Sequence, residues 1–154
     1  MKYKFFRKVF LFVVLTIVSC CPSGTDIYTI VKRTYNNGND TIDFGEALCF
    51  DWDKMYWFPE GYYLDYVNSI VNISRFYHDM TDKIVFVKDG RIVYFREYIP
   101  YHETPQKRVS FNPDSALVFQ RDNALFAIEK VSDKLYILSH IPKITIVDTS
   151  LSGN

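Results

Sequence analysis

Residues 83–96 read KIVFVKDGRIVYFR, and this stretch decides the fold because it predicts two strands joined by a tight turn. Asp89-Gly90 supplies the positive φ angles that a two-residue type I′ turn requires. Both faces of the hairpin are largely apolar, so we expect it at the centre of a sheet and covered on both sides. The predicted register pairs Val87 with Ile92, Phe86 with Val93 and Val85 with Tyr94.

Further short segments on either side of this hairpin have the composition of strands. They are rich in aromatic and β-branched residues, which favour pleated, half-buried surfaces, and turn residues separate them. Asp122-Asn123 is predicted to join two of them as a second hairpin, and 99–114 is predicted to be an exposed loop. The predicted strands are 27–35, the aromatic-rich run within 41–58, 115–121, 124–131, 135–139 and an edge strand at 143–147.

One segment, residues 63–77, has helical periodicity, with apolar side chains at three- and four-residue steps such as Tyr66, Val67 and Ile70. Repeated short strands joined by tight turns predict an antiparallel sheet. We therefore expect an α+β fold made of a single antiparallel sheet of about five to seven strands with one packed helix.

The chain begins with a basic and apolar leader, MKYKFFRKVFLFVVLTIVSCC (1–21). Four basic residues precede the apolar stretch 9–18, and Ser19 precedes Cys20. A secretory signal peptide has a positively charged start, an apolar stretch of roughly 7–15 residues and a small residue at the cleavage site. The apolar stretch is well short of the ~20 residues that a membrane-spanning helix needs, so we expect it to direct export and to be removed.

Residues 17–20, Ile-Val-Ser-Cys, resemble the lipobox of bacterial lipoproteins, in which an aliphatic residue and two tolerant positions precede a cysteine. The resemblance implies cleavage before Cys20, a diacylglycerol on the Cys20 thiol and often acylation of the new amine. Two or three acyl chains attach a protein stably to a membrane, whereas one holds only marginally. The alternative is an ordinary secreted protein whose apolar stretch happens to end in cysteine. The implied organisation is a lipoprotein signal peptide at 1–19, a lipidated tether at 20–26, an α+β domain at 27–148 and a frayed tail at 149–154.

Three runs in the rest of the chain resemble a pattern in small, uncharacterised bacterial lipoproteins, and this resemblance implies no activity. They are DWDKMYWF (51–58), IVFVKDGRIVYF (84–95) and FQRDNALFAI (119–128). In lipoprotein sorting, a residue other than aspartate after the lipidated cysteine, here Cys21, disfavours retention in the inner membrane. The expected location is therefore the cell envelope: the outer membrane of a two-membrane host, or otherwise the outer face of the cell membrane.

Charge and cysteine content limit the partners and cofactors. Residues 20–154 carry 14 Lys and Arg against 18 Asp and Glu, a net charge of −4, which is a poor balance for neutralising nucleic-acid phosphates. Cys21 and Cys49 could pair in an oxidising envelope, but the apolar neighbours of Cys49 favour a buried free thiol. No cysteine or histidine spacing is typical of zinc, so we predict no metal and no cofactor.

The clearest candidate for chemistry is Asp51-Trp52-Asp53. On a strand the two carboxylates lie on the same face, about 6.5–7 Å apart, which suits paired-carboxylate hydrolysis or a hard-metal site. We favour the simpler interpretation of two solvated acids beside an inward Trp52. The sequence has no nucleophile elbow and no glycine-rich phosphate loop, so we assign no catalytic residue and expect the protein not to be an enzyme.

The aromatic residues around position 57 can form either core or a binding surface. Most should be core, but there are more of them than one strand face can bury, and Trp and Tyr are favoured anchors in interfaces. The candidate interaction surface is Asp51, Trp52, Asp53, Tyr56, Trp57, Tyr62 and Tyr63.

These observations predict a membrane-anchored, non-catalytic module that binds a protein or another envelope component. It would present the aromatic region 52–66 or the loop 99–114 to that partner. The alternatives are an envelope hydrolase that uses Asp51 and Asp53, and a carrier of a small apolar ligand.

Overall fold

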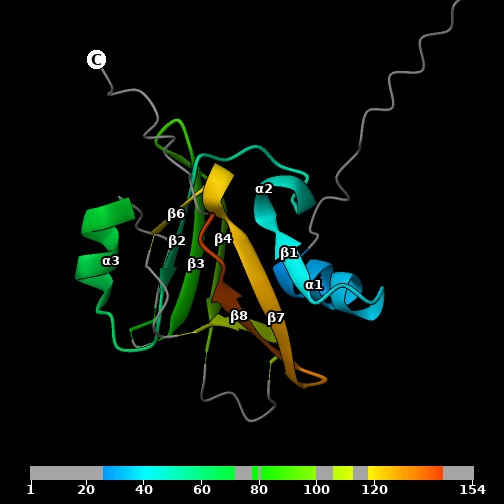
Figure 1. Cartoon of the computed structure of the whole chain (residues 1–154). Coiled ribbons are helices and arrows are strands. Elements are labelled where there is room, and N and C mark those ends of the chain that lie inside the picture. Colours follow the sequence, from blue (N-terminus) through cyan, green and yellow to red (C-terminus); the bar gives the residue numbers. More distant parts are fainter. Residues whose placement is uncertain (1–25, 72–77, 80, 100–105, 113–117, 144–154) are drawn as a thin grey trace, which may run out of the picture.

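A computed structural model describes residues 26–71, 78–79, 81–99, 106–112 and 118–143 (Figure 1). The helices are α1 (Ile27–Asn36), α2 (Phe44–Ala47), α3 (Leu64–Val71) and the 3-10 turn η1 (Arg121–Asn123). The strands are β1 (Thr41–Asp43), β2 (Lys54–Phe58), β3 (Asp82–Lys88), β4 (Arg91–Tyr98), β5 (Arg108–Phe111), β6 (Val118–Gln120), β7 (Leu125–Ser132) and β8 (Leu135–His140). The mixed α+β class is thus confirmed.

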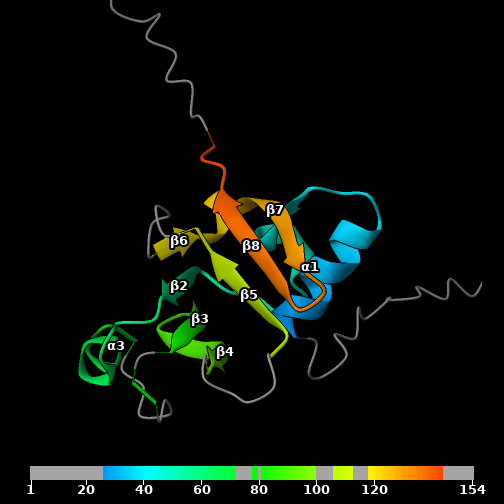
Figure 2. The same cartoon turned by 90° about the horizontal axis from the view of Figure 1, so that it is seen from below.

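The strands form two four-stranded sheets, so the prediction of a single sheet is wrong. Sheet A has the order β1-β7-β8-β5, and sheet B has the order β4-β3-β2-β6. Figure 2 shows β7, β8 and β5 side by side in sheet A, with β2, β3 and β4 of sheet B beside them. All pairs are antiparallel except β5 with β8, which is parallel.

The two sheets are separate because β6 and β7 do not pair with each other, as the predicted 115–131 hairpin would require. The backbone N–H of Arg121 donates to Asp53 O, and the N–H of Phe44 donates to Ala124 O, so η1 is held between two other segments. The chain therefore leaves β6, which pairs with β2, and enters β7, which pairs with β1 and β8. The connection crosses from one sheet to the other instead of folding back.

One core lies between the two sheets, and aromatic rings join them. Trp57 of sheet B lies 5.4 Å from Phe111 of sheet A, centroid to centroid, and Phe119 lies 5.0 Å from Phe126. Contacts of this kind bury apolar surface from both inner faces, which is the main favourable term in folding.

Residues 27–35 are helical, and their prediction as a strand is wrong. Their β-branched content suggested a strand, but Ile27, Ile30 and Val31 also have the three- and four-residue spacing of a helix and are fully buried. The turn residues that follow end the helix, because Gly38 adopts a φ of +86° and donates to Tyr35 O. The buried side of α1 completes the core.

The 83–96 hairpin is confirmed as β3 and β4, with positive φ at both Asp89 and Gly90. Val87 pairs with Ile92 as predicted, but a bulge next to Phe86 shifts every pair further from the turn by one residue. The predicted central position is wrong for β4, which is an edge strand of sheet B.

Other predicted elements have mixed outcomes. The 135–139 strand is confirmed as β8, whereas β5 lies within the predicted 99–114 loop, because Val109 and Phe111 alternate into the core. The predicted 63–77 helix is present as α3 up to residue 71, and residues 72–77 lie outside the described part. Of the predicted 143–147 strand only residue 143 is described, and the tail 149–154 also lies outside the description.

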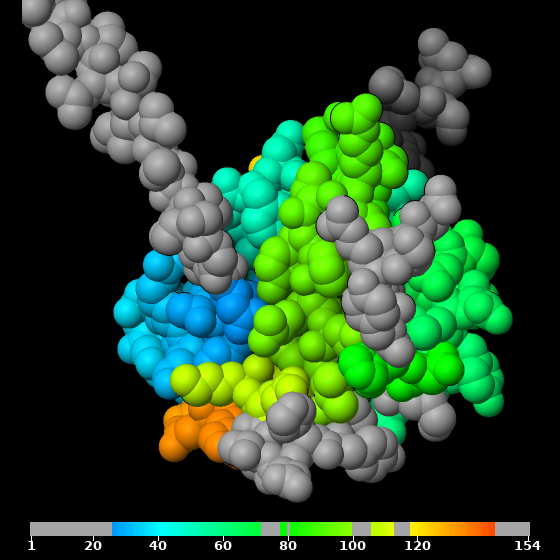
Figure 3. Space-filling view, turned by 180° about the vertical axis from the view of Figure 1, so that it is seen from behind, coloured from blue at the N-terminus to red at the C-terminus, as the bar shows by residue number. Residues whose placement is uncertain are grey.

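Helix α3 covers the outer face of sheet B, opposite the main core. Val67 and Val71 of α3 pack with Phe58 and Val85 in a second, smaller cluster. Figure 3 shows the β3–β4 hairpin between α1 on one side and α3 on the other. Within the described residues, no helix is long and apolar enough to cross a membrane.

Candidate functional site

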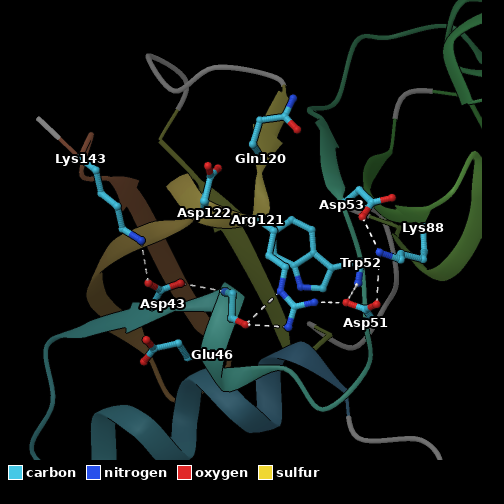
Figure 4. Close-up of a pocket in the computed structure, with 11 residues that line it drawn as sticks. Asp43, Glu46, Asp51, Trp52, Asp53, Lys88, Gln120, Arg121, Asp122 and Lys143 are labelled. Carbon is cyan, nitrogen blue, oxygen red and sulfur yellow. Dashed lines mark hydrogen bonds and ion pairs between the residues drawn. The ribbon is translucent and has the colours of Figure 1, made fainter. Parts of the chain in front are cut away.

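A cavity of about 520 Å³ opens where α2, η1, the chain entering β2 and the β3–β4 turn meet (Figure 4). Eight of its lining residues are charged, and its floor includes Trp52, which is fully buried. The lining residues are Asp43, Gly45, Glu46, Asp51, Trp52, Asp53, Lys88, Gln120, Arg121, Asp122 and Lys143. We refer to this feature as the charged pocket.

Helix α2 forms one wall of the charged pocket, and local capping fixes it in place. Asp43 is its N-cap, with Oδ1 accepting a 2.8 Å hydrogen bond from the N–H of Gly45. Phe44 points into the core and is fully buried. This anchoring holds the carbonyl of Gly45 toward the guanidinium of Arg121.

Arg121 connects three segments at the centre of the charged pocket. Its Nε and Nη2 donate to Gly45 O at 3.3 and 3.2 Å, and its Nη1 pairs with Asp51 Oδ1. Its backbone N–H donates to Asp53 O at 3.1 Å. The planar guanidinium suits this role, because its donors are fixed in a fork.

Lys88 joins the two carboxylates that the sequence singled out. Its Nζ lies 2.8 Å from Asp53 Oδ1 and 3.2 Å from Asp51 Oδ2. Asp53 Oδ2 also accepts a 2.8 Å hydrogen bond from the N–H of Asp89 in the hairpin turn. The two acids therefore converge, although residues 51–53 precede β2 and do not form part of a strand.

These contacts stabilise the ionised forms of both acids. The hydrogen bond from Lys88 lowers the pKa of Asp51 below its ordinary value of 3.8, with further lowering by Arg121. The pKa of Asp53 is lowered by the N–H of Asp89 and then by Lys88. In return, Asp53 and Asp51 raise the pKa of Lys88. At neutral pH neither acid holds a proton that it could donate, as a general acid must.

The other end of the charged pocket is more acidic. Lys143 Nζ lies 3.2 Å from Asp43 Oδ2. Glu46 and Asp122 line the same end, and neither makes an ion pair or side-chain hydrogen bond that involves the described residues (Figure 4). No group of three or more His, Cys, Asp or Glu side chains in the described part is placed to hold a metal ion.

The predicted interaction surface is divided among three places. Trp52 and Trp57 are buried in the main core, where Trp52 joins Met55 and Trp57 because the strand alternation begins only at Lys54. Asp51 and Asp53 line the charged pocket. The remaining members lie with α3 on the outer face of sheet B: Tyr56 and Tyr62 are half-buried and Tyr63 is 69% exposed.

Cys49 is exposed and disulfide-bonded, so the favoured prediction of a buried free thiol is wrong. It lies in the chain segment between α2 and Asp51 and is not part of the core. The other two cysteines of the sequence, Cys20 and Cys21, lie outside the described residues, as does the whole leader.

Sequence reasoning missed most of the charged pocket. Lys88, Arg121 and Lys143 come from a hairpin turn, a 3-10 turn and the chain after β8, and no local pattern connects them. The only available signal was that Lys88 directly precedes Asp89-Gly90, which places it at the end of a strand.

Comparisons with known proteins add no assignment. No known protein family has a model that matches this chain, and neither the curated proteins nor the solved structures contain a match to it.

Proposed function

We propose that this chain is a lipid-anchored envelope protein that binds a protein partner at the charged pocket. The observation that carries the binding part is a concave site with eight charged side chains, in which Asp51 and Asp53 are already bridged by Lys88. Ligand sites are concave and hold a few fixed polar groups that orient the ligand. The anchoring part rests on the lipobox-like residues 17–20.

Binding is better supported than hydrolysis. Paired-carboxylate hydrolysis needs one carboxyl group that keeps its proton, but the pKa values of both Asp51 and Asp53 are lowered. A carrier of an apolar ligand needs an apolar cavity, whereas the charged pocket has charged walls.

One observation still favours the hydrolase as a second candidate: Asp51 and Asp53 converge with other polar groups in a concave pocket, as a catalytic pair would. The purified chain would then hydrolyse an envelope glycan, and Asp53→Asn would abolish that activity. Equal rates for the wild type and this variant, at the level of a blank, would exclude it.

The binding site is tested by photocrosslinking in the native host. A photoreactive amino acid at Gln120, which is exposed at the pocket, should capture a defined protein partner. The same group at Tyr63 on the α3 face, and at Thr29 on α1, provides the comparison. Capture only from position 63 would place the interface on the α3 face. Capture from neither position 120 nor position 63 would contradict the proposal.

The anchor is tested by intact mass of the membrane fraction. We expect residues 20–154 plus two or three acyl chains for the wild type, and uncleaved precursor for Cys20→Ser. An unmodified product outside the membrane fraction would contradict the anchor.

A further inference from the structure

Cys49 is exposed and disulfide-bonded, and its partner follows by elimination. The sequence holds two other cysteines, and the proposed diacylglycerol occupies the thiol of Cys20. This leaves Cys21 as the partner of Cys49. Formation of the bond takes two protons and two electrons from the two thiols, and a disulfide-bearing oxidant of an oxidising envelope accepts them.

The surroundings of Tyr94 on β4 show that the chain is long enough for this pairing. The ring of Phe50, the residue after Cys49, stacks on the ring of Tyr94 with the centroids 5.5 Å apart, and the Tyr94 hydroxyl donates to Asp26 Oδ1 at 3.2 Å. Asp26 and the Cys49 segment therefore lie against the same side chain. The five residues back from Asp26 to Cys21 extend over up to about 17 Å, and a disulfide adds about 5–6 Å between two Cα atoms.

The disulfide changes the length of the lipid tether. Without it, six residue steps separate Cys20 from Asp26, where the described chain begins, and they reach about 20 Å when extended. With it, a single step separates the lipidated Cys20 from the bridged Cys21. The Cα atom of Cys20 then lies within about 10 Å of the Cα atom of Cys49.

The charged pocket lies at the same end of the domain as Cys49. Glu46 and Asp51 both line it, three residues before and two residues after Cys49, so the Cα atoms of Asp51 and Cys49 are within about 7 Å of each other. Helix α2 contacts η1, and β7 leads from η1 to the β7–β8 turn, about 26 Å away for eight residues of strand. Figure 1 shows α2 at one end of the domain and the β7–β8 turn at the other.

The surface around Cys49 suits the headgroup layer of a bilayer and not its hydrocarbon core. It carries charges of both signs, since Asp51 is exposed and the side chain of Arg121 is 41% exposed. Such charges are costly to place in hydrocarbon, but they match headgroups that hold an ammonium and a phosphate. Within residues 44–53 no large apolar side chain is exposed.

We propose that a disulfide between Cys21 and Cys49 holds the charged pocket at the headgroup layer of the membrane, and that the protein partner bound there is itself membrane-bound. The inference rests on the proposed function and deepens it by naming where the pocket meets its partner. A flexible tether of six residues has an r.m.s. length of about 13 Å and lets the domain turn, whereas a single step leaves it few orientations. Orienting the unbound protein in this way reduces the entropy lost on binding.

The test measures energy transfer to a rhodamine-labelled lipid in vesicles of phosphatidylethanolamine and phosphatidylglycerol. The full, acylated chain carries a fluorescent amino acid either at Gln120, beside the pocket, or at Lys134, in the β7–β8 turn; both positions are exposed. Transfer from position 120 should exceed transfer from position 134 at least about twofold, because the length of β7 separates them. Cys21→Ser keeps the lipid and restores the six-residue tether, so it should remove at least about half of this excess. Ser23→Ala, a matched change in the same tether, should keep it.

Two outcomes with the acyl mass intact would overturn the inference: equal transfer from the two positions in the wild type, or an excess that Cys21→Ser leaves unchanged. The anchor and the crosslink from Gln120 would then stand, and only the orientation would fail. A chain that lacks acyl mass and leaves the vesicles would instead contradict the anchor, and the inference with it. Cys49→Ser removes the other half of the disulfide and should act as Cys21→Ser does.

The membrane-bound nature of the partner is tested separately. The protein captured from Gln120 is identified and then fractionated from cells that lack this chain. Recovery with the membranes is the expected result, because the pocket is reached at the headgroup layer. Recovery in the soluble fraction would overturn this part of the inference while leaving the binding site at the pocket.

Discussion

The backbone of Gly45 packs directly against that of Arg121. A Cβ atom added at Gly45 would lie 2.6 Å from the backbone oxygen of Arg121, which is closer than real Cβ atoms come to other atoms, and 3.0 Å from Asp43 Oδ1, which is a tight contact. Two backbones can only meet in this way where one residue has no side chain. This contact brings α2 and η1 together and so forms the charged pocket.

Gly45→Ala should therefore lower the free energy of unfolding by about 1–3 kcal/mol, the usual cost of forcing extra atoms into a packed site. Urea denaturation measures the change. Glu46→Ala, one residue further along α2 and exposed, should change the free energy by less than about 0.5 kcal/mol. Equal stability of Gly45→Ala and the wild type would mean that α2 moves away without cost.

Two tyrosines in edge-to-face contact give a matched pair of hydroxyl deletions. The rings of Tyr28 and Tyr136 lie 5.6 Å apart. The hydroxyl of Tyr28 donates to Asp133 O, whereas the buried hydroxyl of Tyr136 has no hydrogen-bond partner among the described residues.

Tyr28→Phe should cost about 0.5–1.5 kcal/mol of unfolding free energy, the net value of a typical hydrogen bond. Tyr136→Phe should cost less than about 0.5 kcal/mol or should stabilise, because a buried polar group without a partner is unfavourable. Urea denaturation of both variants side by side decides the order, and a larger cost for Tyr136→Phe would contradict these hydrogen-bond assignments.

Short-range signals in the sequence were sufficient for the β3–β4 hairpin but not for its full register. Asp89-Gly90 determines the turn locally, because few other residues adopt positive φ at both positions. The bulge beside Phe86 has no such marker. The strand order is set by long-range pairing, so the position of β4 at an edge could not be predicted.

Residues 27–35 do have local signals, but these signals fit two different structures. The β-branched residues favour a strand, and the spacing of Ile27, Ile30 and Val31 favours a helix. Tertiary packing decides between them: α1 buries these three side chains in the core shared by both sheets.

The charged pocket was foreseeable only in its two acids. Asp51 and Asp53 are two positions apart, so their joint orientation could be considered from sequence. Arg121 is 70 positions from Asp51, and its arrival there depends on the pairing of β6 with β2, which places Gln120 opposite Lys54. This long-range strand pairing has no local marker in the sequence, so these residues could not be placed together in advance.

The ion pairs of the charged pocket have a measurable pH signature. Carboxyl NMR titration should give Asp51 and Asp53 pKa values below 3.8. Because the pKa values of both acids are lower in the folded protein than in the unfolded chain, their ionised forms stabilise the fold. This contribution to the free energy of unfolding is fully present above the unfolded-state pKa of about 4, and it is lost as the pH falls from there through the folded-state values. Asp51, Asp53 and Lys88 should therefore keep their charges from neutral pH down to about pH 5.

Lys88→Gln should raise both pKa values toward 3.8, since Lys88 bonds to both carboxylates. Lys107→Gln, an exposed lysine outside the pocket, should leave them unchanged. Unshifted values in Lys88→Gln would mean that Lys88 does not bridge the two acids in solution.

The disulfide of Cys49 and the proposed lipid on Cys20 make a joint prediction about thiols. A thioether-linked Cys20 cannot form a disulfide, so Cys21 is the only cysteine left to pair with Cys49. Alkylation under denaturing, non-reducing conditions should then label no thiol in the wild type. Cys21→Ser and Cys49→Ser should each expose one thiol and keep the acyl mass.

The added cysteine of Thr29→Cys, at an exposed position of α1, calibrates the labelling at one thiol per chain. A wild-type protein that carries one free thiol and no acyl chain would contradict the anchor. Cys49 would then be bonded either to Cys20, with Cys21 left reduced, or to Cys21, with Cys20 left reduced. The Cys21→Ser variant separates these two cases: the disulfide survives only if Cys20 is the partner. Acyl mass with one disulfide and no free thiol is the one result that agrees with both the lipobox and the bonded state of Cys49, because it leaves each of the three cysteines with a single role.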